Sequence, residues 1–272
     1  MFKRLLLTCC LLFANSVYAK NSYGLYDFTN LRYEHSRNTT EVRSIASITK
    51  LFTAITVINS GVDLNEKVKI NGKSRGKVPP GSYMTRMDLM RAMLISSDNR
   101  ASETLANHHP GGFTQFIKDV NLYISDHSLH NTKIVDSTGL LADNVSTAHE
   151  LIEVLGLVRN QPIIRSIAGE RNASITTPAG KRTIRVNLNN TNPEIFTYDN
   201  ILISKTGFTT PAGRCVLMLV EKNTELYAVV VLGQPSTHKR SILVKELLNV
   251  DVPVLPETKI NSTVEFDFSN TK

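Results

Sequence analysis

The sequence predicts an α/β (α+β) protein in which helices flank one antiparallel sheet and a second lobe is mainly helical. Strand-like segments occur near both ends of the chain, in residues 23–46 and again in 200–207, 214–220 and 226–232. Between them lie segments whose apolar residues recur at helical spacing. A sheet whose strands come from both ends of the chain, with helices inserted between them, accounts for this order.

The helices are identified by the spacing of their apolar residues and by the residues that end them. The first is expected to begin at Ser47 and to end at Gly61. Its apolar face is formed by Leu51, Phe52, Ile55 and Ile58. Further helices are expected over residues 87–95, 100–107, 113–122, 147–157 and 242–248.

The beginning of the chain has the pattern of a cleavable secretory signal. Lys3 and Arg4 precede an apolar run over residues 5–13, and small residues around Ala19 supply a cleavage site. The apolar run is too short to remain as a membrane-spanning helix. We therefore expect a signal peptide over residues 1–19, a mature start at Lys20, and a periplasmic protein.

The remaining chain is expected to form one domain over residues 20–250, followed by a short C-terminal tail over 251–272. Residues 259–268 alternate like a strand and carry no amphipathic helical stripe, which argues against a stable membrane anchor. Loss of the signal lowers the net charge of +7 by two and leaves scattered basic residues. Export and scattered charge together argue against nucleic-acid binding.

Cys215 is the one cysteine outside the predicted signal, because the other two of the three lie within it. A disulfide framework is therefore excluded, although an exported protein could carry one. Cys215 sits in an apolar run, so we expect a buried side chain and no reactive thiol.

The first motif that indicates chemistry is Ser47-Ile48-Thr49-Lys50. Residues at i and i+3 share one helix face, which brings Ser47 and Lys50 together. A serine hydroxyl is a weak nucleophile until a neighbouring base removes its proton. Lys50 can be that base only when neutral, so its pKa has to fall from about 10.4 toward roughly 7–8 through burial or a nearby cation. Alone, the pattern is common by chance.

The second motif, Ser97-Asp98-Asn99, lies at a predicted break between two helices. Serine, aspartate and asparagine are all good N-cap residues, so a purely structural role is one interpretation. The hydroxyl of Ser97 can also pass a proton to a departing amine. The amide of Asn99 can both orient Lys50 and bind a substrate carbonyl.

The third motif, Lys205-Thr206-Gly207, ends a strand-like run. An edge-strand lysine before a glycine bulge is the structural alternative. As part of a site, Lys205 would supply a second cation that lowers the pKa of Lys50 and attracts a substrate carboxylate. Gly207 would let a substrate backbone lie against the strand edge without a clash.

In this order, the three motifs form the signature of penicillin-binding proteins and class A β-lactamases. The chain resembles the low-molecular-mass penicillin-binding proteins. Among them it is similar to the D-alanyl-D-alanine endopeptidases, which cut cross-links between peptidoglycan peptides. The resemblance covers about residues 40–250. Besides the three motifs, it is carried by residues 44–46, 108–112, 137–140, 144–148, 190–192 and 207–213.

The resemblance implies a β-lactamase/transpeptidase-like fold and a hydrolase that passes through an acyl-enzyme. Ser47 would attack the carbonyl of a D-alanine residue while Lys50 takes its proton. The backbone N–H groups of Ser47 and Phe208 would form the oxyanion hole. Ser97 would help to protonate the leaving amine, and Asn99 would hold the substrate.

The resemblance also implies which groups bind substrate and which ligands the protein meets. The expected substrate-binding residues are Lys205, Thr206, Gly207, Phe208, Thr209 and Arg240, the last at the terminal carboxylate of the substrate. The expected partners are peptidoglycan cross-links, with β-lactams as covalent inhibitors. No cofactor and no metal are implied. The pairs His108-His109 and His149-Glu150 lack the further ligands that a metal site requires.

Three alternatives stay open. A D-alanyl-D-alanine carboxypeptidase would use the same site, and a dual activity is compatible with the motifs. A class A-like β-lactamase would need a Glu-x-x-Leu-Asn loop after the second motif, and residues 125–150 contain no such sequence. A non-catalytic penicillin sensor would keep the motifs but is usually tethered by a membrane helix.

Overall fold

The computed structural model describes residues 21–179 and 182–248. The predicted signal peptide over residues 1–19 and the predicted tail over 251–272 lie outside the described residues. Within the described part of the chain, no helix is long and apolar enough to span a membrane. The domain limits given above therefore remain predictions.

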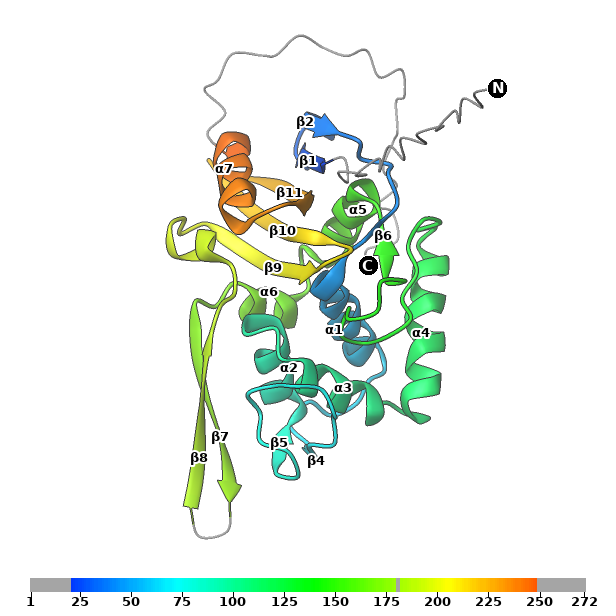
Figure 1. The fold of residues 1–272 in the computed structure, drawn as a ribbon, viewed down its shortest axis with the longest axis vertical. Coiled ribbons are helices and arrows are strands. Elements are labelled where there is room, and N and C mark those ends of the chain that lie inside the picture. The colour runs from blue at the N-terminus through cyan, green and yellow to red at the C-terminus, as the bar shows by residue number, and fades with distance from the viewer. Residues whose placement is uncertain (1–20, 180–181, 249–272) are drawn as a thin grey trace, which may run out of the picture.

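A five-stranded antiparallel sheet joins the two ends of the described chain (Figure 1). Its strands are β1 (Ser22–Asp27), β2 (Arg32–Arg37), β9 (Ile201–Thr209), β10 (Gly213–Lys222) and β11 (Glu225–Gln234). Their order across the sheet is β2-β1-β11-β10-β9, which leaves β9 at one edge. Because Ser22 of β1 pairs with Leu232 of β11, the first strand lies beside the last. The predicted sheet is confirmed.

Helices cover both faces of this sheet. α5 (Ala148–Val158) contacts β1, β10 and β11, whereas α7 (Thr237–Leu248) contacts β10 and β11. Figure 1 shows the strands between these two helices. The expected closing helix is therefore present, and it begins earlier than residue 242.

Side chains of β10 alternate between two cores, as they must in a strand that is covered on both faces. Cys215, Leu217 and Leu219 are buried with α5, and Val216, Met218 and Val220 are buried with α7. The structure confirms the expected burial of Cys215, and burial raises the pKa of its thiol to about 11.

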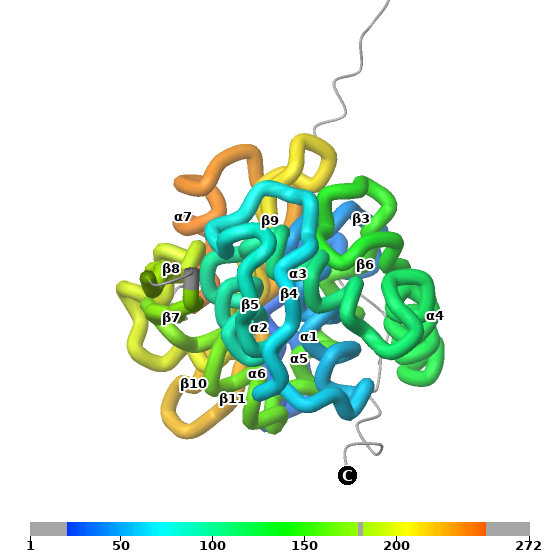
Figure 2. Tube along the Cα trace, turned by 90° about the horizontal axis from the view of Figure 1, so that it is seen from below, coloured from blue at the N-terminus to red at the C-terminus, as the bar shows by residue number. Residues whose placement is uncertain are grey.

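The second lobe is mainly helical, as predicted (Figures 1 and 2). It contains α1 (Thr49–Asn59), α2 (Arg86–Ile95), α3 (Asn99–Asn107) and α4 (Gly112–Asp126), and α6 (Pro162–Ala168) joins it to β9. α1 is the centre of the lobe because it contacts α2, α3 and α4. Every residue from Thr49 to Val57 is buried. This burial holds α1 firmly at the junction of the sheet and the helices.

A two-stranded ribbon of β7 (Asn172–Ala179) and β8 (Arg182–Asn189) extends away from the body of the molecule in Figure 1. The sequence pattern did not predict it. Ile175, Val186 and Leu188 bury the base of the ribbon against the helical lobe. Most other residues of β8 are exposed, so the apolar alternation that identifies a half-buried strand is weak.

Four short strands were also missed because each is only two or three residues long. β3 (Arg43–Ser44) pairs with β6 (Val145–Ser146), and β4 (Lys67–Lys69) pairs with β5 (Tyr83–Thr85). Pairs this short bury too few side chains to leave a periodic pattern. The first pair matters for the site because β3 ends just before residue 47.

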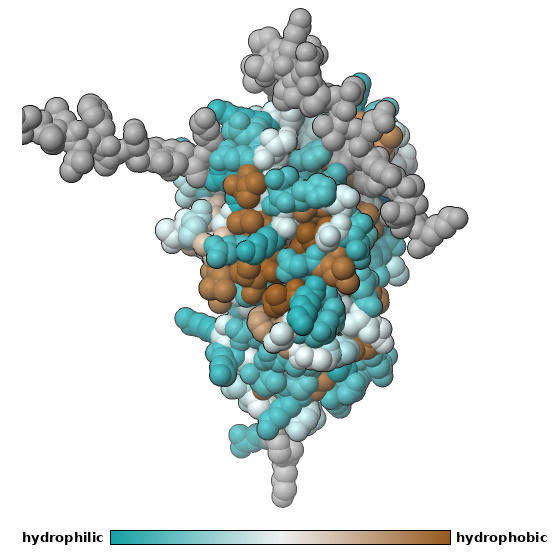
Figure 3. Space-filling model, turned by 90° about the vertical axis from the view of Figure 1, so that its right-hand side faces the viewer, coloured by the Kyte–Doolittle hydropathy of each residue, from teal (hydrophilic) through white to brown (hydrophobic). Residues whose placement is uncertain are grey.

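α4 lies at one side of the helical lobe, opposite the β7–β8 ribbon in Figure 2. Phe116, Val120 and Ile124 anchor it to the core. Its outer side exposes Phe113 and Leu122, which are 40% and 58% accessible. The face of the molecule seen in Figure 3 accordingly shows apolar side chains among polar ones.

The double coverage of β10 leads to a prediction about stability. Leu217 is fully buried between the sheet and the helices on the α5 side. We expect Leu217→Ala to lower the free energy of unfolding by about 2–5 kcal/mol, because it leaves a cavity in a packed core. Leu122→Ala, on the exposed side of α4, is the matched control and should change it by about 0.5 kcal/mol or less. Urea unfolding measures both, and equal effects would contradict the assigned core.

Candidate functional site

Ser47 lies in a tight turn at the start of α1. A single 3-10 turn, Ala46–Ile48, precedes the helix, so Ser47 stands before α1 and does not begin it as predicted. Ala46 has a φ of +47°, in the left-handed region that costs a non-glycine residue about 1–2 kcal/mol. The backbone N–H of Ile45 donates to the carbonyl of Asn144 at 3.0 Å. The turn is therefore held in this conformation by its neighbours.

The amine of Lys50 is the centre of the site. It is fully buried, and its Nζ lies 3.0 Å from the Oγ of Ser47. Nζ donates to the Oδ1 of Asn99 at 2.7 Å and to the carbonyl of Thr138 at 2.6 Å. The structure thus brings together the first two motifs and one further group, the Thr138 carbonyl.

Burial sets the protonation of this amine. It lowers the pKa of Lys50 from 10.5 to about 7, although nearby carboxylates oppose the shift. Those carboxylates belong to Asp136, Asp98 and Glu103. The predicted low pKa is therefore present, with burial as its cause. At neutral pH an appreciable fraction of Lys50 is the free amine.

The second motif divides its two expected roles between different residues. Asp98 is the N-cap of α3, because its carboxylate accepts the N–H of Ala101 at 2.8 Å. Ser97, with a φ of +56°, turns the chain away from α2. Asn99 begins α3 and directs its amide oxygen to Lys50. Capping by Asp98 therefore leaves the polar groups on either side of it for the site.

Lys205 extends from the edge strand β9 toward the helical lobe. Its buried Nζ donates to the Oγ of Ser97 at 3.0 Å and to the carbonyl of Thr206 at 2.8 Å. Burial and the charges of Lys50 and Arg240 hold the pKa of Lys205 well below its usual range. The sequence predicts that Lys205 lowers the pKa of Lys50; in the structure the charge of Lys50 lowers the pKa of Lys205, whereas burial lowers that of Lys50.

Gly207 permits a close approach of the chain's own backbone, and the predicted approach of a substrate stays a prediction. A Cβ built at Gly207 would lie 2.9 Å from the carbonyl of Ile45 and 3.0 Å from the backbone nitrogen of Ser47. The strand edge thus packs on the chain's own turn. This contact places β9 directly beside the backbone of Ser47.

The residues that follow Gly207 reach the surface of the protein. Phe208 is 50% exposed, and the guanidinium of Arg214 stacks on its ring at 3.6 Å. The Oγ1 of Thr209 accepts the N–H of Ala212 at 3.2 Å and so closes the turn between β9 and β10. Thr206 shares a hydrogen bond of 2.7 Å with Thr191, which the motifs did not single out.

Arg240 is buried on α7 and is already paired. Its guanidinium is 3% exposed and lies 3.2 Å from the carboxylate of Glu194, which is 6% exposed. The partnership was not predicted, because residues 46 positions apart carry no joint signal in the sequence. In this structure the positive charge of Arg240 is therefore balanced by the carboxylate of Glu194.

The role of Thr138 was also missed, although residues 137–140 carry part of the family resemblance. Thr138 acts through its backbone carbonyl, and every residue type carries one, so no residue pattern identifies it. The nearest signal is the stretch from Asp136 to Gly139, which is typical of a side-chain-capped turn. Such a turn indicates local structure but gives no hint of a contact with Lys50.

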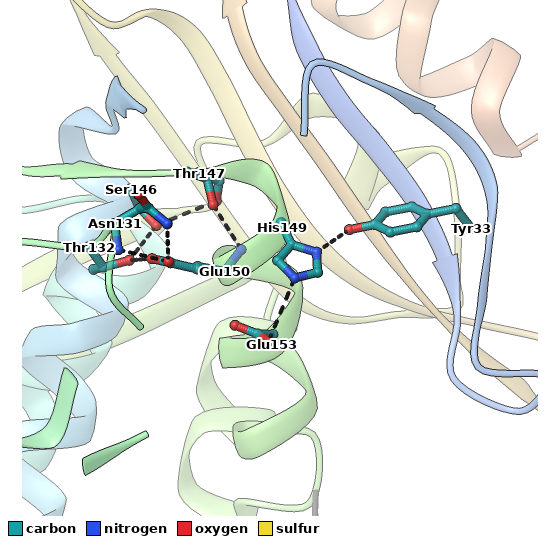
Figure 4. Close-up of polar contacts among 8 residues, drawn as sticks. All are labelled: Tyr33, Asn131, Thr132, Ser146, Thr147, His149, Glu150 and Glu153. Atoms are coloured by element: carbon teal, nitrogen blue, oxygen red, sulfur yellow. Dashed lines mark hydrogen bonds and ion pairs between the residues drawn. The ribbon is translucent and has the colours of Figure 1, made fainter. Parts of the chain in front are cut away.

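His149 and Glu150 have structural partners (Figure 4). His149 shares a hydrogen bond of 2.8 Å with the hydroxyl of Tyr33 on β2, and the carboxylate of Glu153 lies 3.8 Å from its ring. His108 is the C-cap residue of α3. Within residues 21–179 and 182–248, no three His, Cys, Asp or Glu residues group as a metal site would require.

Sequence comparisons identify both D-alanyl-D-alanine endopeptidases and D-alanyl-D-alanine carboxypeptidases as relatives. Residues 18–236 match the profile of the family described as D-alanyl-D-alanine carboxypeptidase. The chain is 34% identical to a D-alanyl-D-alanine endopeptidase of Escherichia coli, over 79% of this chain and 71% of that protein. It is 36% identical to a D-alanyl-D-alanine endopeptidase of Pseudomonas aeruginosa, over 73% of this chain and 66% of that protein.

Comparison with solved structures identifies the fold. The DD-transpeptidase of a Streptomyces strain superposes with a TM-score of 0.77 at 21% identity, covering 84% of this chain and 94% of that one. A penicillin-binding protein of Listeria monocytogenes, in its ampicillin-bound form, has a TM-score of 0.73 at 26% identity, with coverages of 84% and 95%. The predicted transpeptidase-like fold is confirmed.

The buried amine of Lys50 makes stability depend on pH. Its pKa falls from 10.5 to about 7 on folding, so between these values the unfolded chain holds a proton that the folded chain has released. Burial of Lys50 therefore does not lower the free energy of unfolding above pH 10.5, and it lowers this free energy by its full amount below about pH 7. Stability therefore rises with pH across this window.

We expect the free energy of unfolding of the parent, minus that of Lys50→Met, to rise by up to about 1.4 kcal/mol per pH unit in this window. Urea titrations at several pH values measure this difference. The methionine keeps the volume of the side chain and removes its titration. A difference that stays constant with pH would show that Lys50 keeps its ordinary pKa in the folded protein.

Proposed function

The chain belongs to the D-alanyl-D-alanine carboxypeptidase family of serine peptidases, and on this premise we propose that it is a serine DD-endopeptidase of the peptidoglycan. It would hydrolyse D-alanyl cross-links through an acyl-enzyme. The observation that carries the proposal is the buried Lys50 amine, 3.0 Å from the hydroxyl oxygen of Ser47. The endopeptidase names of the two relatives described above support the choice of substrate.

Ser47 is the proposed nucleophile and Lys50 its base. A neutral amine has two N–H bonds and one lone pair. The Asn99 oxygen and the Thr138 carbonyl lie at hydrogen-bond distance from Nζ and can accept both N–H groups. The lone pair is then left for the hydroxyl of Ser47, whose proton it can take.

In the acylation step, the oxygen of Ser47 bonds to the carbonyl carbon of a D-alanine residue while Lys50 takes the hydroxyl proton. The backbone N–H groups of Ser47 and Phe208 would hold the developing oxyanion, a contribution of about 3–4 kcal/mol for each donor in other enzymes. The contact of Gly207 with the Ser47 turn supports this assignment, because it keeps β9 beside the nucleophile.

Breakage of the amide bond then needs a proton on the departing nitrogen. Ser97 is the proposed donor, since its hydroxyl accepts a hydrogen bond from Lys205 and can pass its own proton on. The proton taken from Ser47 thus returns through Lys50 and Ser97 to the leaving amine. Water afterwards attacks the ester, releases the peptide acid and restores the Ser47 hydroxyl.

The edge of β9 is the proposed binding surface for the carboxylate side of the substrate. Lys205 supplies positive charge there, and Thr206, Gly207, Phe208 and Thr209 follow it along the strand. The guanidinium of Arg240 already forms an ion pair with Glu194. Arg240 would therefore attract the substrate carboxylate electrostatically, without direct contact. β-Lactams present a reactive amide to the same nucleophile, and we propose that they acylate Ser47 covalently.

The proposed substrate lies outside the cytoplasm, in the cell wall. A signal peptide over residues 1–19 and a periplasmic location are part of the proposal and rest on the sequence pattern. A carboxypeptidase activity would use the same groups, since both reactions cleave a bond on the carboxyl side of D-alanine. The products therefore distinguish the two.

Digestion of purified cross-linked muropeptides tests the proposed activity. We expect the parent protein to convert dimers to monomers, as measured by mass spectrometry, and Ser47→Ala to convert none because it lacks the attacking oxygen. Release of free D-alanine from pentapeptides without loss of dimers would instead indicate a carboxypeptidase. Cleavage by Ser47→Ala at the parental rate would exclude Ser47 as the nucleophile.

The pH dependence of acylation tests the proposed base. Because burial lowers the pKa of Lys50 to about 7 and only the free amine can accept a proton, acylation should accelerate with pH through this value and then level off. The second-order rate constant for labelling by a fluorescent penicillin measures this profile. A rate constant independent of pH across this range would rule out titration of Lys50 as its origin.

A further inference from the structure

The loop that carries Thr138 is folded around one half-buried carboxylate. The Oδ1 of Asp136 accepts the backbone N–H and the hydroxyl of Thr138, at 2.6 and 3.0 Å, and the N–H of Gly139 at 2.6 Å. Its Oδ2 accepts the N–H of Leu141 at 2.8 Å and the amide of Asn144 at 3.1 Å. Every one of these partners is a donor, so the loop is matched to an ionised acid.

The charge of Asp136 is stable in this position. Burial alone would raise the pKa of Asp136, but the hydrogen bonds from Leu141, Gly139 and Thr138 outweigh it and lower the pKa. The hydrogen bonds of the folded loop therefore stabilise the ionised carboxylate.

Two consecutive carbonyls of this loop point at the helices of the site. The carbonyl of Ser137 accepts the hydroxyls of Thr53 on α1 and Ser102 on α3, at 2.8 and 2.5 Å. The next carbonyl, of Thr138, accepts the Lys50 amine at 2.6 Å and lies 3.4 Å from the Ser47 hydroxyl oxygen. The loop is thus docked on both helices beside the proposed nucleophile.

Gly139 fixes how closely the loop approaches. Its φ is +81°, and a Cβ built there would lie 1.9 Å from the carbonyl oxygen of Ala46. A side chain at this position would push the loop away from the turn that holds Ser47. The backbone contact leaves little freedom for the neighbouring Thr138 carbonyl.

A second carboxylate, which is buried, holds the base of the same segment (Figure 4). Glu150 accepts the N–H and side-chain amide of Asn131, at 2.8 and 2.9 Å, and the hydroxyl of Thr132 at 2.5 Å. Lys133 forms a β-bridge with Val145. Since the base is secured independently, Asp136 is left to shape the tip.

We propose that Asp136 is a positioning residue for Lys50. Its carboxylate folds the tip of the loop so that the Thr138 carbonyl accepts one N–H of the Lys50 amine. With Asn99 accepting the other N–H, the lone pair faces the hydroxyl of Ser47. The inference rests on the proposed function, and it assigns to the loop the orientation of the base.

Losing this carbonyl would act in two ways. The amine could rotate and turn an N–H toward Ser47, which would remove the base without removing the residue. The ammonium form would also lose an acceptor and a nearby negative charge, which lowers its pKa. The charged groups around Lys50 are Asp136, Asp98 and Glu103, with Lys205 as the neighbouring cation.

The test compares acylation by a fluorescent penicillin across a pH series in the parent, Asp136→Asn, Asp136→Glu and Asp143→Asn. An amide at position 136 would turn an NH₂ group toward N–H donors, and a glutamate keeps the charge but displaces it. Asp143→Asn is the matched control, since it removes an exposed charge from the same loop. Rates are normalised to the folded fraction, measured by near-ultraviolet circular dichroism.

We expect Asp136→Asn to lower the plateau rate constant about a hundredfold, as misplacement of a catalytic group by roughly 1 Å can do. The rise of its pH profile should also move to lower pH, which a general loss of stability would not cause. Asp136→Glu should lower the plateau with a smaller movement of the profile. Asp143→Asn should match the parent.

The inference would be overturned if folded Asp136→Asn kept the plateau rate constant and the pH profile of the parent. It would also be overturned if Asp143→Asn lost as much of the plateau rate constant as Asp136→Asn. If Asp136→Asn does not fold, a parental plateau in Asp136→Glu overturns the inference and a lowered plateau supports it. Failure of the proposed function is a separate outcome. In that case the parent itself would not be acylated, or Ser47→Ala would be labelled at the same rate.

Discussion

The amine of Lys50 is fully buried, and its hydrogen-bond partners come from three segments that are distant in the sequence. Ser47 belongs to the turn before α1, Asn99 to the start of α3, and Thr138 to a loop folded around a carboxylate. An amine without such partners would be costly to remove from water. Because α1 is buried along most of its length, these segments have to assemble around it, and the helical lobe is arranged accordingly.

The second constraint is the seam between that lobe and the sheet. β9 lies at the sheet edge, where Lys205 reaches Ser97 across the seam and Gly207 packs on the backbone before α1. Both lysines are buried there, which lowers the pKa of each, and the charge of Lys50 lowers that of Lys205 further. The same packing that closes the protein thus keeps one of its lysines ready to lose a proton near neutrality.

Much of this arrangement could be predicted from the sequence, and the exceptions share a physical reason. Periodic apolar residues identified α1 and the strands of the main sheet, and residue types with known chemistry identified Ser47, Lys50 and Lys205. What was missed acts through the backbone or through distant pairing: the Thr138 carbonyl, the ion pair of Arg240 with Glu194, and the polar β7–β8 ribbon. None of these leaves a local pattern of residue types.

The pairing of β1 with β11 has a consequence for how the molecule is made. Ser22 meets Leu232 in the register of the sheet, so β1 has only its neighbour β2 as a partner until nearly the whole described chain is available. Contacts between such distant residues form late, because the intervening loop has to be closed first. A chain that emerges with its N-terminus first therefore carries Ser47 and Lys50 for most of its synthesis without Lys205. Assembly of the nucleophile with its second cation therefore has to wait until β9 has been made.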